Sequence, residues 1–128
     1  YGEHTDNALM GTVRTDFALT LFLNAPDSYD GGELVLEADR EPHRIKLAAG
    51  SAVVYPASTI HRVEPVTRGR RDVAVTWIQS MVRDPGKREI ITDLGIALTH
   101  ARKIAPDDRE TLLIAKSRAN LLRMWADT

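Results

Sequence analysis

The stretch RTDFALTLFLN, residues 14–24, decides the fold class of this chain. Its apolar residues Phe17, Leu19, Leu21 and Leu23 recur at every second position, so they fall on one face of an extended strand. Aromatic and β-branched residues in the same stretch also favour extended structure. The stretch therefore predicts a β-strand.

Short strand-like segments of this kind occupy the chain from its first residue to about Val82. Turn-forming sequences separate them: DSYDGG at residues 27–32, AAGS at 48–51 and TRGR at 67–70. Gly31 and Gly32 are expected to be turn glycines with positive φ. About six or seven short strands at this spacing indicate a β-sandwich or barrel and not a parallel α/β sheet.

The pattern becomes helical after RDPGK, residues 83–87, where a proline and a glycine end the strands. Apolar residues then recur at helical spacing, at Ile91, Leu94, Leu98, Ala101 and Ile104, and again at Leu112, Ala115, Ala119 and Leu122. Pro106 separates the two series. We therefore expect a β core over residues 1–82 and, over residues 83–128, a helical hairpin that packs on it.

Composition excludes several classes of protein. Seventeen basic residues balance 18 acidic ones, giving a net charge of −1 and a pI near 6.5, which argues against nucleic-acid binding and a polybasic membrane anchor. No apolar run approaches the roughly 18–20 residues of a membrane span. The absence of cysteine excludes thiolate chemistry, so a metal would need histidine and carboxylate ligands. We expect a cytoplasmic protein with no membrane or nucleic-acid partner.

A possible metal site begins at YGEHTDN, residues 1–7. His4 and Asp6 are two positions apart, so on a strand they face the same way. His61 starts another strand-like segment and shares the face of apolar Val63. Two histidines and one carboxylate on one face suit Fe(II) with three open coordination positions, and Zn(II) accepts the same ligands.

An arginine follows His61 by ten residues, at the start of the segment RDVAVTWIQSMV, residues 71–82. Alternation places Arg71 on the same face as Val73, Val75 and Trp77, where a cation is costly unless an anion pairs with it. A guanidinium binds a carboxylate through two parallel hydrogen bonds, and Tyr1 lies near enough to His4 to offer a hydroxyl. A small dicarboxylate such as 2-oxoglutarate would reach from the metal to Arg71.

These segments resemble those of the bacterial PKHD-type hydroxylases, Fe(II)/2-oxoglutarate-dependent dioxygenases related to prolyl and lysyl hydroxylases. The resemblance covers nearly all of residues 1–82 and extends more weakly into the helical tail. The matching motifs are YGEHTDN (1–7), RTDFALTLFLN (14–24), YDGGELVLE (29–37), AGSAVVYPASTIHRVEPVTRGRR (49–71) and TWIQSMVRD (76–84).

The resemblance implies a double-stranded β-helix, or jelly roll, of the cupin-like kind. It implies that His4, Asp6 and His61 bind Fe(II) and that Arg71, in preference to Arg68 or Arg70, anchors the 2-oxoglutarate carboxylate. Tyr1 and Trp77 match positions in the cosubstrate pocket. Family members carry further structure before the tyrosine, so we expect the N-terminal part of the family domain to be missing here.

The implied activity is hydroxylation of an unactivated C–H bond in a protein side chain or a small molecule. It is coupled to O2-dependent decarboxylation of 2-oxoglutarate to succinate and CO2, with ascorbate as a plausible auxiliary. Family analogy suggests prolyl or lysyl side chains or an iron-chelating metabolite as substrate. The alternatives are a cupin-like metal-binding module without turnover and a non-redox cupin enzyme using Zn(II) or Mn(II). The apolar residues of the tail, Leu112, Ile114, Leu121 and Trp125, also predict a homo-oligomer.

Overall fold

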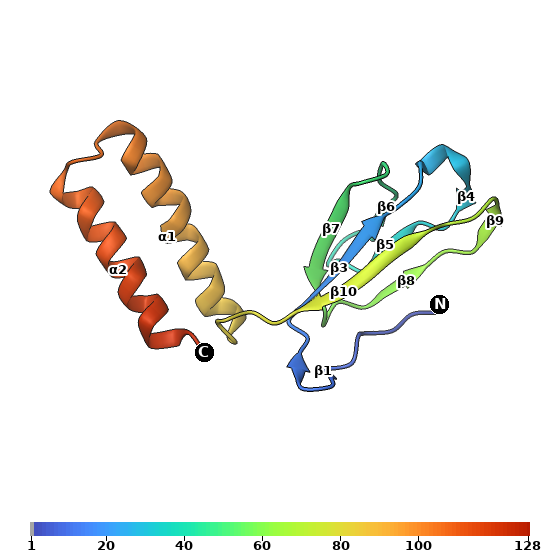
Figure 1. The fold of residues 1–128 in the computed structure, drawn as a ribbon, viewed down its shortest axis with the longest axis horizontal. Coiled ribbons are helices and arrows are strands. Elements are labelled where there is room, and N and C mark those ends of the chain that lie inside the picture. The colour runs from blue at the N-terminus through green and yellow to red at the C-terminus, as the bar shows by residue number, and fades with distance from the viewer. Residues whose placement is uncertain (1) are drawn as a thin grey trace. The chain divides into compact units, whose positions relative to one another are not determined.

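A computed structural model describes residues 2–128 of the chain. The chain divides into two compact units, residues 1–79 and residues 80–128. The strands of the described residues lie in the first unit, and the second holds two α-helices (Figure 1). The expectation of a mainly β chain with a C-terminal helical hairpin is confirmed. The packing of the hairpin on the β core stays a prediction.

Two three-stranded antiparallel sheets form the body of the first unit. One has the order β10-β3-β7, with β10 at Val73–Ile78, β3 at Phe17–Phe22 and β7 at Ala52–Pro56. The other has the order β6-β5-β8, with β6 at His43–Ile45, β5 at Leu34–Leu36 and β8 at His61–Val63. Smaller elements complete the unit: β1 (Leu9–Met10) paired with β2 (Val13–Arg14), β4 (Asp30–Gly31) paired with β9 (Val66–Arg68), and the 3-10 helix η1 (Pro26–Ser28).

Strand β3, predicted from residues 14–24, lies at the centre of its sheet. Its more buried face carries Ala18, Thr20 and Phe22, while the predicted apolar face of Phe17, Leu19 and Leu21 is only partly buried, and Leu23 beyond it is exposed. Trp77 lies opposite Ala18 in the register. Opposed residues share a face of the sheet, so small residues of β3 and Trp77 of β10 border the same interior space.

Close backbone contact fixes the turn before β5. Gly31 and Gly32 have φ values of +71° and +70°, which confirms their expected positive φ. A Cβ atom added at Gly31 would lie 2.0 Å from the carbonyl oxygen of Pro65, so no larger residue fits between β4 and β9 without a backbone shift.

The second unit is a pair of helices, α1 (Pro85–Ile104) and α2 (Arg109–Trp125). Asp84 caps α1, because its Oδ1 accepts a hydrogen bond of 2.9 Å from the N–H of Lys87. Pro85 therefore begins the helix, where its missing N–H costs nothing. Within the described residues, no helix combines the length and the apolar character needed to cross a membrane.

Candidate active site

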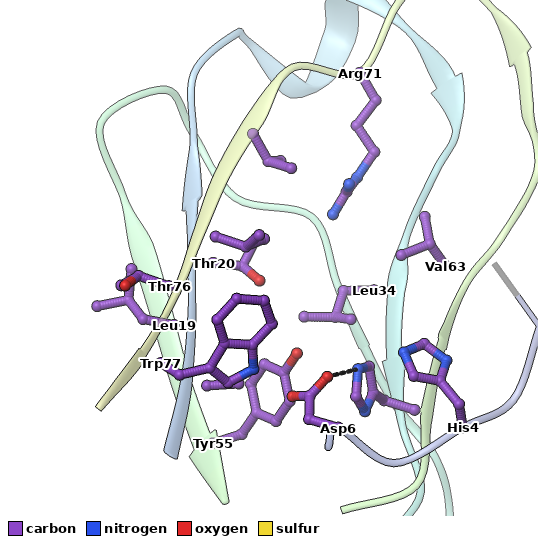
Figure 2. A pocket seen from close by; sticks show the side chains of 14 residues that line it. His4, Asp6, Leu19, Thr20, Leu34, Tyr55, Val63, Arg71, Thr76 and Trp77 are labelled. Atoms are coloured by element: carbon purple, nitrogen blue, oxygen red, sulfur yellow. Dashed lines mark ion pairs between the residues drawn. The ribbon is translucent and has the colours of Figure 1, made fainter. Parts of the chain in front are cut away.

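A cavity of about 330 Å³ lies inside the first unit, with walls from both three-stranded sheets (Figure 2). His4 and Asp6 lie at one end, and the Arg71 side chain points into the cavity from the other (Figure 2). His61 belongs to the same cluster as His4 and Asp6. The walls between these ends include Thr20, Leu34, Tyr55, Val63, Val73 and Trp77. The structure thus brings the described site residues that the sequence singled out around one space.

Backbone pairing places the two histidines opposite each other. The His4 N–H donates to the His61 carbonyl at 3.0 Å, and the His61 N–H donates to the His4 carbonyl at 2.9 Å. In such an antiparallel pair the two side chains project from the same face, and the ring centroids lie 4.3 Å apart. Two residues further on, the Asp6 N–H donates to the Ala57 carbonyl at 3.2 Å, which holds Asp6 on that face too.

Both imidazoles are oriented by backbone carbonyls. His4 Nδ1 lies 2.7 Å from the carbonyl oxygen of Gly2, and His61 Nδ1 lies 2.9 Å from that of Thr59. A carbonyl oxygen only accepts hydrogen bonds, so in each neutral ring Nδ1 carries the proton and Nε2 carries the lone pair. This is the arrangement of metal-binding histidines, in which the second ring nitrogen donates to a carbonyl or carboxylate.

Asp6 completes the cluster. Its Oδ1 lies 3.7 Å from His61 Nε2, and one ligand atom from each of His4, Asp6 and His61 lies within 4.8 Å of the others. Among the described residues, its Oδ2 is buried and has no hydrogen-bond partner. A buried carboxylate oxygen without a donor is costly, and a cation bound at this point would satisfy it.

Arg71 supplies the opposite charge at the other end of the cavity. Its guanidinium lies 5.7 Å from the centre of the Phe22 ring, and no carboxylate of the described residues pairs with it. Burial lowers the pKa of Arg71 from its ordinary value, because desolvation disfavours the charged form. Its Nε is buried without a partner among residues 2–128.

The neighbouring arginines behave differently. Arg68 donates to Asp30 at 2.8 Å, and Arg70 pairs with Asp72 at 2.9 Å, both on the surface. Of the three arginines in RGRR, residues 68–71, Arg71 is therefore the one that faces the cavity and is available to an anion.

Trp77 and Tyr1 were the two further residues predicted to lie in the cosubstrate pocket. Trp77 lines the cavity, and its buried indole N–H has no acceptor among the described residues. Tyr1, expected to reach the cosubstrate, lies outside the described residues.

Sequence reasoning missed the hydroxyl groups of the cavity wall. Tyr55 is buried on β7 and packs edge-on against His61 with ring centroids 5.2 Å apart. Burial, and then the nearby charge of Asp6, raise the pKa of Tyr55 above its ordinary value. Its neutral phenol is thus a stable hydrogen-bonding group beside the metal cluster. The period-two pattern of residues 17–23 gave no signal for these hydroxyls, because it placed Thr20 on the face opposite the apolar residues.

Comparison with known proteins gives the family. Residues 1–79 match the model of the 2OG-Fe(II) oxygenase superfamily. The chain is 55% identical over 127 residues to a PKHD-type hydroxylase of Acaryochloris marina and 54% identical over 129 residues to one of Maricaulis maris. Each alignment covers 99% of this chain and 58% of the relative, so the chain spans less than two thirds of their length.

A solved structure supports the fold. A 2OG-Fe(II) oxygenase family oxidoreductase from Burkholderia pseudomallei matches 59% of this chain and 35% of its own, with a TM-score of 0.50 and 26% identity. Together with the two antiparallel sheets, this likeness confirms the expected jelly roll. The family model covers well over half of the residues, and the chain therefore belongs to the 2OG-Fe(II) oxygenase superfamily.

Proposed function

We propose that this chain carries the active site of an Fe(II)/2-oxoglutarate-dependent dioxygenase that hydroxylates an unactivated C–H bond. The observation that supports this best is the position of Arg71. A half-buried guanidinium without an anionic partner faces the same cavity as a His–Asp–His cluster. A metal site used only for binding has no need of a second anchor for a diacid.

The residues at the metal end fit Fe(II). His4 and His61 offer Nε2 lone pairs, and Asp6 offers a carboxylate whose buried Oδ2 has no donor among the described residues. Two imidazoles and one carboxylate hold Fe(II) and leave coordination positions open. These three residues would therefore hold the metal.

The other cavity residues fit 2-oxoglutarate. Arg71 would bind the carboxylate farther from the metal through two parallel hydrogen bonds. Leu34, Val63 and Val73 give the wall between the two ends an apolar surface that excludes water from the reacting groups. Bound Fe(II) and 2-oxoglutarate would supply the oxidative chemistry: one oxygen atom of O2 goes to the hydroxylated product and the other to succinate, as 2-oxoglutarate loses CO2.

The proposed substrate is a protein side chain, such as a prolyl or lysyl residue, or a small molecule. The name of these relatives, PKHD-type hydroxylase, supports hydroxylation as the reaction type. Ascorbate is a proposed auxiliary reductant. Mass spectrometry of candidate peptides and iron-chelating metabolites, searching for the gain of one oxygen atom, identifies the substrate class.

The experiment that tests the reaction is succinate formation from 2-oxoglutarate. We expect succinate to require Fe(II) and O2, and to be lost in His61→Ala. Arg68→Ala is the matched control, because its guanidinium pairs with Asp30 on the surface. Metal binding without succinate formation would favour the alternative, a cupin-like metal-binding module. Turnover of another substrate with Zn(II) or Mn(II), without 2-oxoglutarate, would favour a non-redox cupin enzyme.

We also propose that the helical unit forms a homo-oligomer and that the protein is cytoplasmic, without a nucleic-acid partner. Exposed apolar residues on α1 and α2, including Ile96, Ile104 and Leu112, support self-association. The near-zero net charge and the absence of cysteine support the other two proposals. Light scattering that finds only monomer at all concentrations would contradict the homo-oligomer.

A further inference from the structure

A tyrosine behind the cavity wall has a hydroxyl that the proposed reaction does not yet use. Tyr29, which follows η1, is 1% exposed, and its phenol oxygen is buried without a hydrogen-bond partner among the described residues. Arg71 Nε is buried and unpartnered in the same way. Buried polar atoms are almost always hydrogen-bonded, so two such atoms on neighbouring side chains call for a physical explanation.

The two side chains are neighbours across a glycine. A Cβ atom added at Gly32 would lie 3.0 Å from Arg71 Cδ and also 3.0 Å from Tyr29 Cε2. Gly32 has a φ of +70° and no side chain, so the guanidinium stem, the phenol ring and a methyl group of Val66, also 3.0 Å from that Cβ position, converge on one point. The atom bonded to Arg71 Cδ is Nε, and the carbon bonded to Tyr29 Cε2 carries the hydroxyl. The two unpartnered groups thus lie on adjoining parts of the two side chains.

Other contacts hold Tyr29 in place. Lys46 Nζ donates to the Tyr29 carbonyl at 2.7 Å and lies 4.2 Å from the centre of its ring. A Cβ atom added at Gly69 would lie 3.0 Å from Tyr29 Cα, which shows how closely the β9–β10 turn packs on this residue. Because Tyr29 is fixed, the more flexible Arg71 side chain is the partner that adjusts.

We propose that Tyr29 is a positioning residue for Arg71: its hydroxyl accepts a hydrogen bond from the Nε–H of Arg71 when the diacid is bound. An arginine that uses Nε–H in this way keeps its two terminal amino groups for the ligand. Tyr29 does not line the cavity, so it acts through Arg71 and not by touching the ligand. This inference rests on the proposed function, because it assigns the distal carboxylate of 2-oxoglutarate to Arg71.

The test compares two 2-oxo acids of equal chain length. 2-Oxoglutarate ends in a carboxylate, whereas 2-oxovalerate ends in a methyl group and has nothing to offer Arg71. Dissociation constants are measured without O2, from the charge-transfer absorption that each acid produces on the Fe(II)-loaded protein. We expect Tyr29→Phe to weaken 2-oxoglutarate binding by roughly three- to tenfold, the effect of one hydrogen bond. Binding of 2-oxovalerate should not change.

A double variant separates positioning from direct contact. The ammonium group of Arg71→Lys has no Nε–H, so adding Tyr29→Phe to it should cause no further loss of 2-oxoglutarate affinity. Arg70→Met is the control, because it removes a surface guanidinium that pairs with Asp72 and leaves the contacts of Tyr29 in place. It should leave the ratio of the two dissociation constants as in the unmodified protein.

Several results would overturn the inference. Equal weakening of both acids by Tyr29→Phe would show a general structural role, and no weakening of either would show no role. Equal loss with and without Arg71→Lys would show that Tyr29 contacts the ligand itself. If the unmodified protein binds no 2-oxoglutarate, the proposed function fails and this inference fails with it. Binding that Tyr29→Phe leaves unchanged overturns the inference alone.

Discussion

At the metal end of the cavity, a backbone carbonyl sets the tautomer of each histidine. Gly2 and Thr59 supply these oxygens, so no side-chain substitution removes them. Asp6 has no such support for its Oδ2 among the described residues. The carboxylate is therefore the ligand that gains most from a bound cation.

The substitution Asp6→Asn tests whether the Asp6 carboxylate is a metal ligand. The amide keeps the shape of the carboxylate and removes its negative charge, so we expect Mn(II) affinity, measured by electron paramagnetic resonance titration, to fall by more than about tenfold. Asp72→Asn is the control, because that carboxylate pairs with Arg70 away from the cavity. Equal affinity in the two variants would rule out Asp6 as a ligand.

Period-two alternation explains why the sequence indicated some site residues. The alternation predicted that Arg71 and Trp77 lie on one face of a strand, and that His61 and Val63 do so on another strand. All four residues line the cavity. Tyr29 gave no such signal, because the turn at Gly32, and not strand alternation, brings it next to Arg71. Thr20 and Tyr55 look like ordinary strand residues in the sequence. Only the pairing of β3 with β7 brings both residues into the wall of one cavity.

At the scale of elements, the pairing of β4 with β9 depends on a glycine. Gly31 combines a φ of +71° with a position where a Cβ would lie 2.0 Å from the Pro65 carbonyl oxygen. Gly11 has a similar φ of +62°, but a Cβ there would meet nothing within 4 Å. Comparing substitutions at the two glycines therefore separates the cost of backbone strain from the cost of steric overlap.

We expect Gly31→Ala to lower the free energy of unfolding by about 2–4 kcal/mol, the sum of left-handed strain and overpacking. Gly11→Ala should cost about 1 kcal/mol, from strain alone. Urea unfolding followed by circular dichroism measures both. Equal losses in the two variants would mean that the contact with Pro65 is relieved at no cost.

The sequence pattern indicated the type of each element but not where the last strand ends or which face of β3 is buried. RDPGK was expected to end the strands, but the last strand, β10, already ends at Ile78. RDPGK instead starts a helix, with Asp84 as the cap and Pro85 as its first residue. The apolar alternation in β3 correctly indicated a strand. However, its more buried face carries Ala18 and Thr20, because small side chains leave room for the cavity.

At the scale of the whole molecule, ligands should stabilise the unit that contains the site. Saturating Fe(II) or Mn(II) with 2-oxoglutarate, without O2, should add about 2.7 kcal/mol when free ligand is one hundred times its dissociation constant. If the hairpin packs on the core, as predicted, the two units unfold together and one calorimetric transition moves to higher temperature. Two transitions of which only one moves would contradict that packing.

We propose that one cavity holds a ferrous ion at its histidine end and a diacid at its arginine end. The most direct measurement is the visible absorption spectrum of the protein with Fe(II) and 2-oxoglutarate in the absence of O2. We predict a metal-to-ligand charge-transfer band that His61→Ala abolishes. Arg71→Ala should weaken the binding of 2-oxoglutarate by about thirtyfold or more. A spectrum without the band, or an equally strong affinity in Arg71→Ala, would contradict the account.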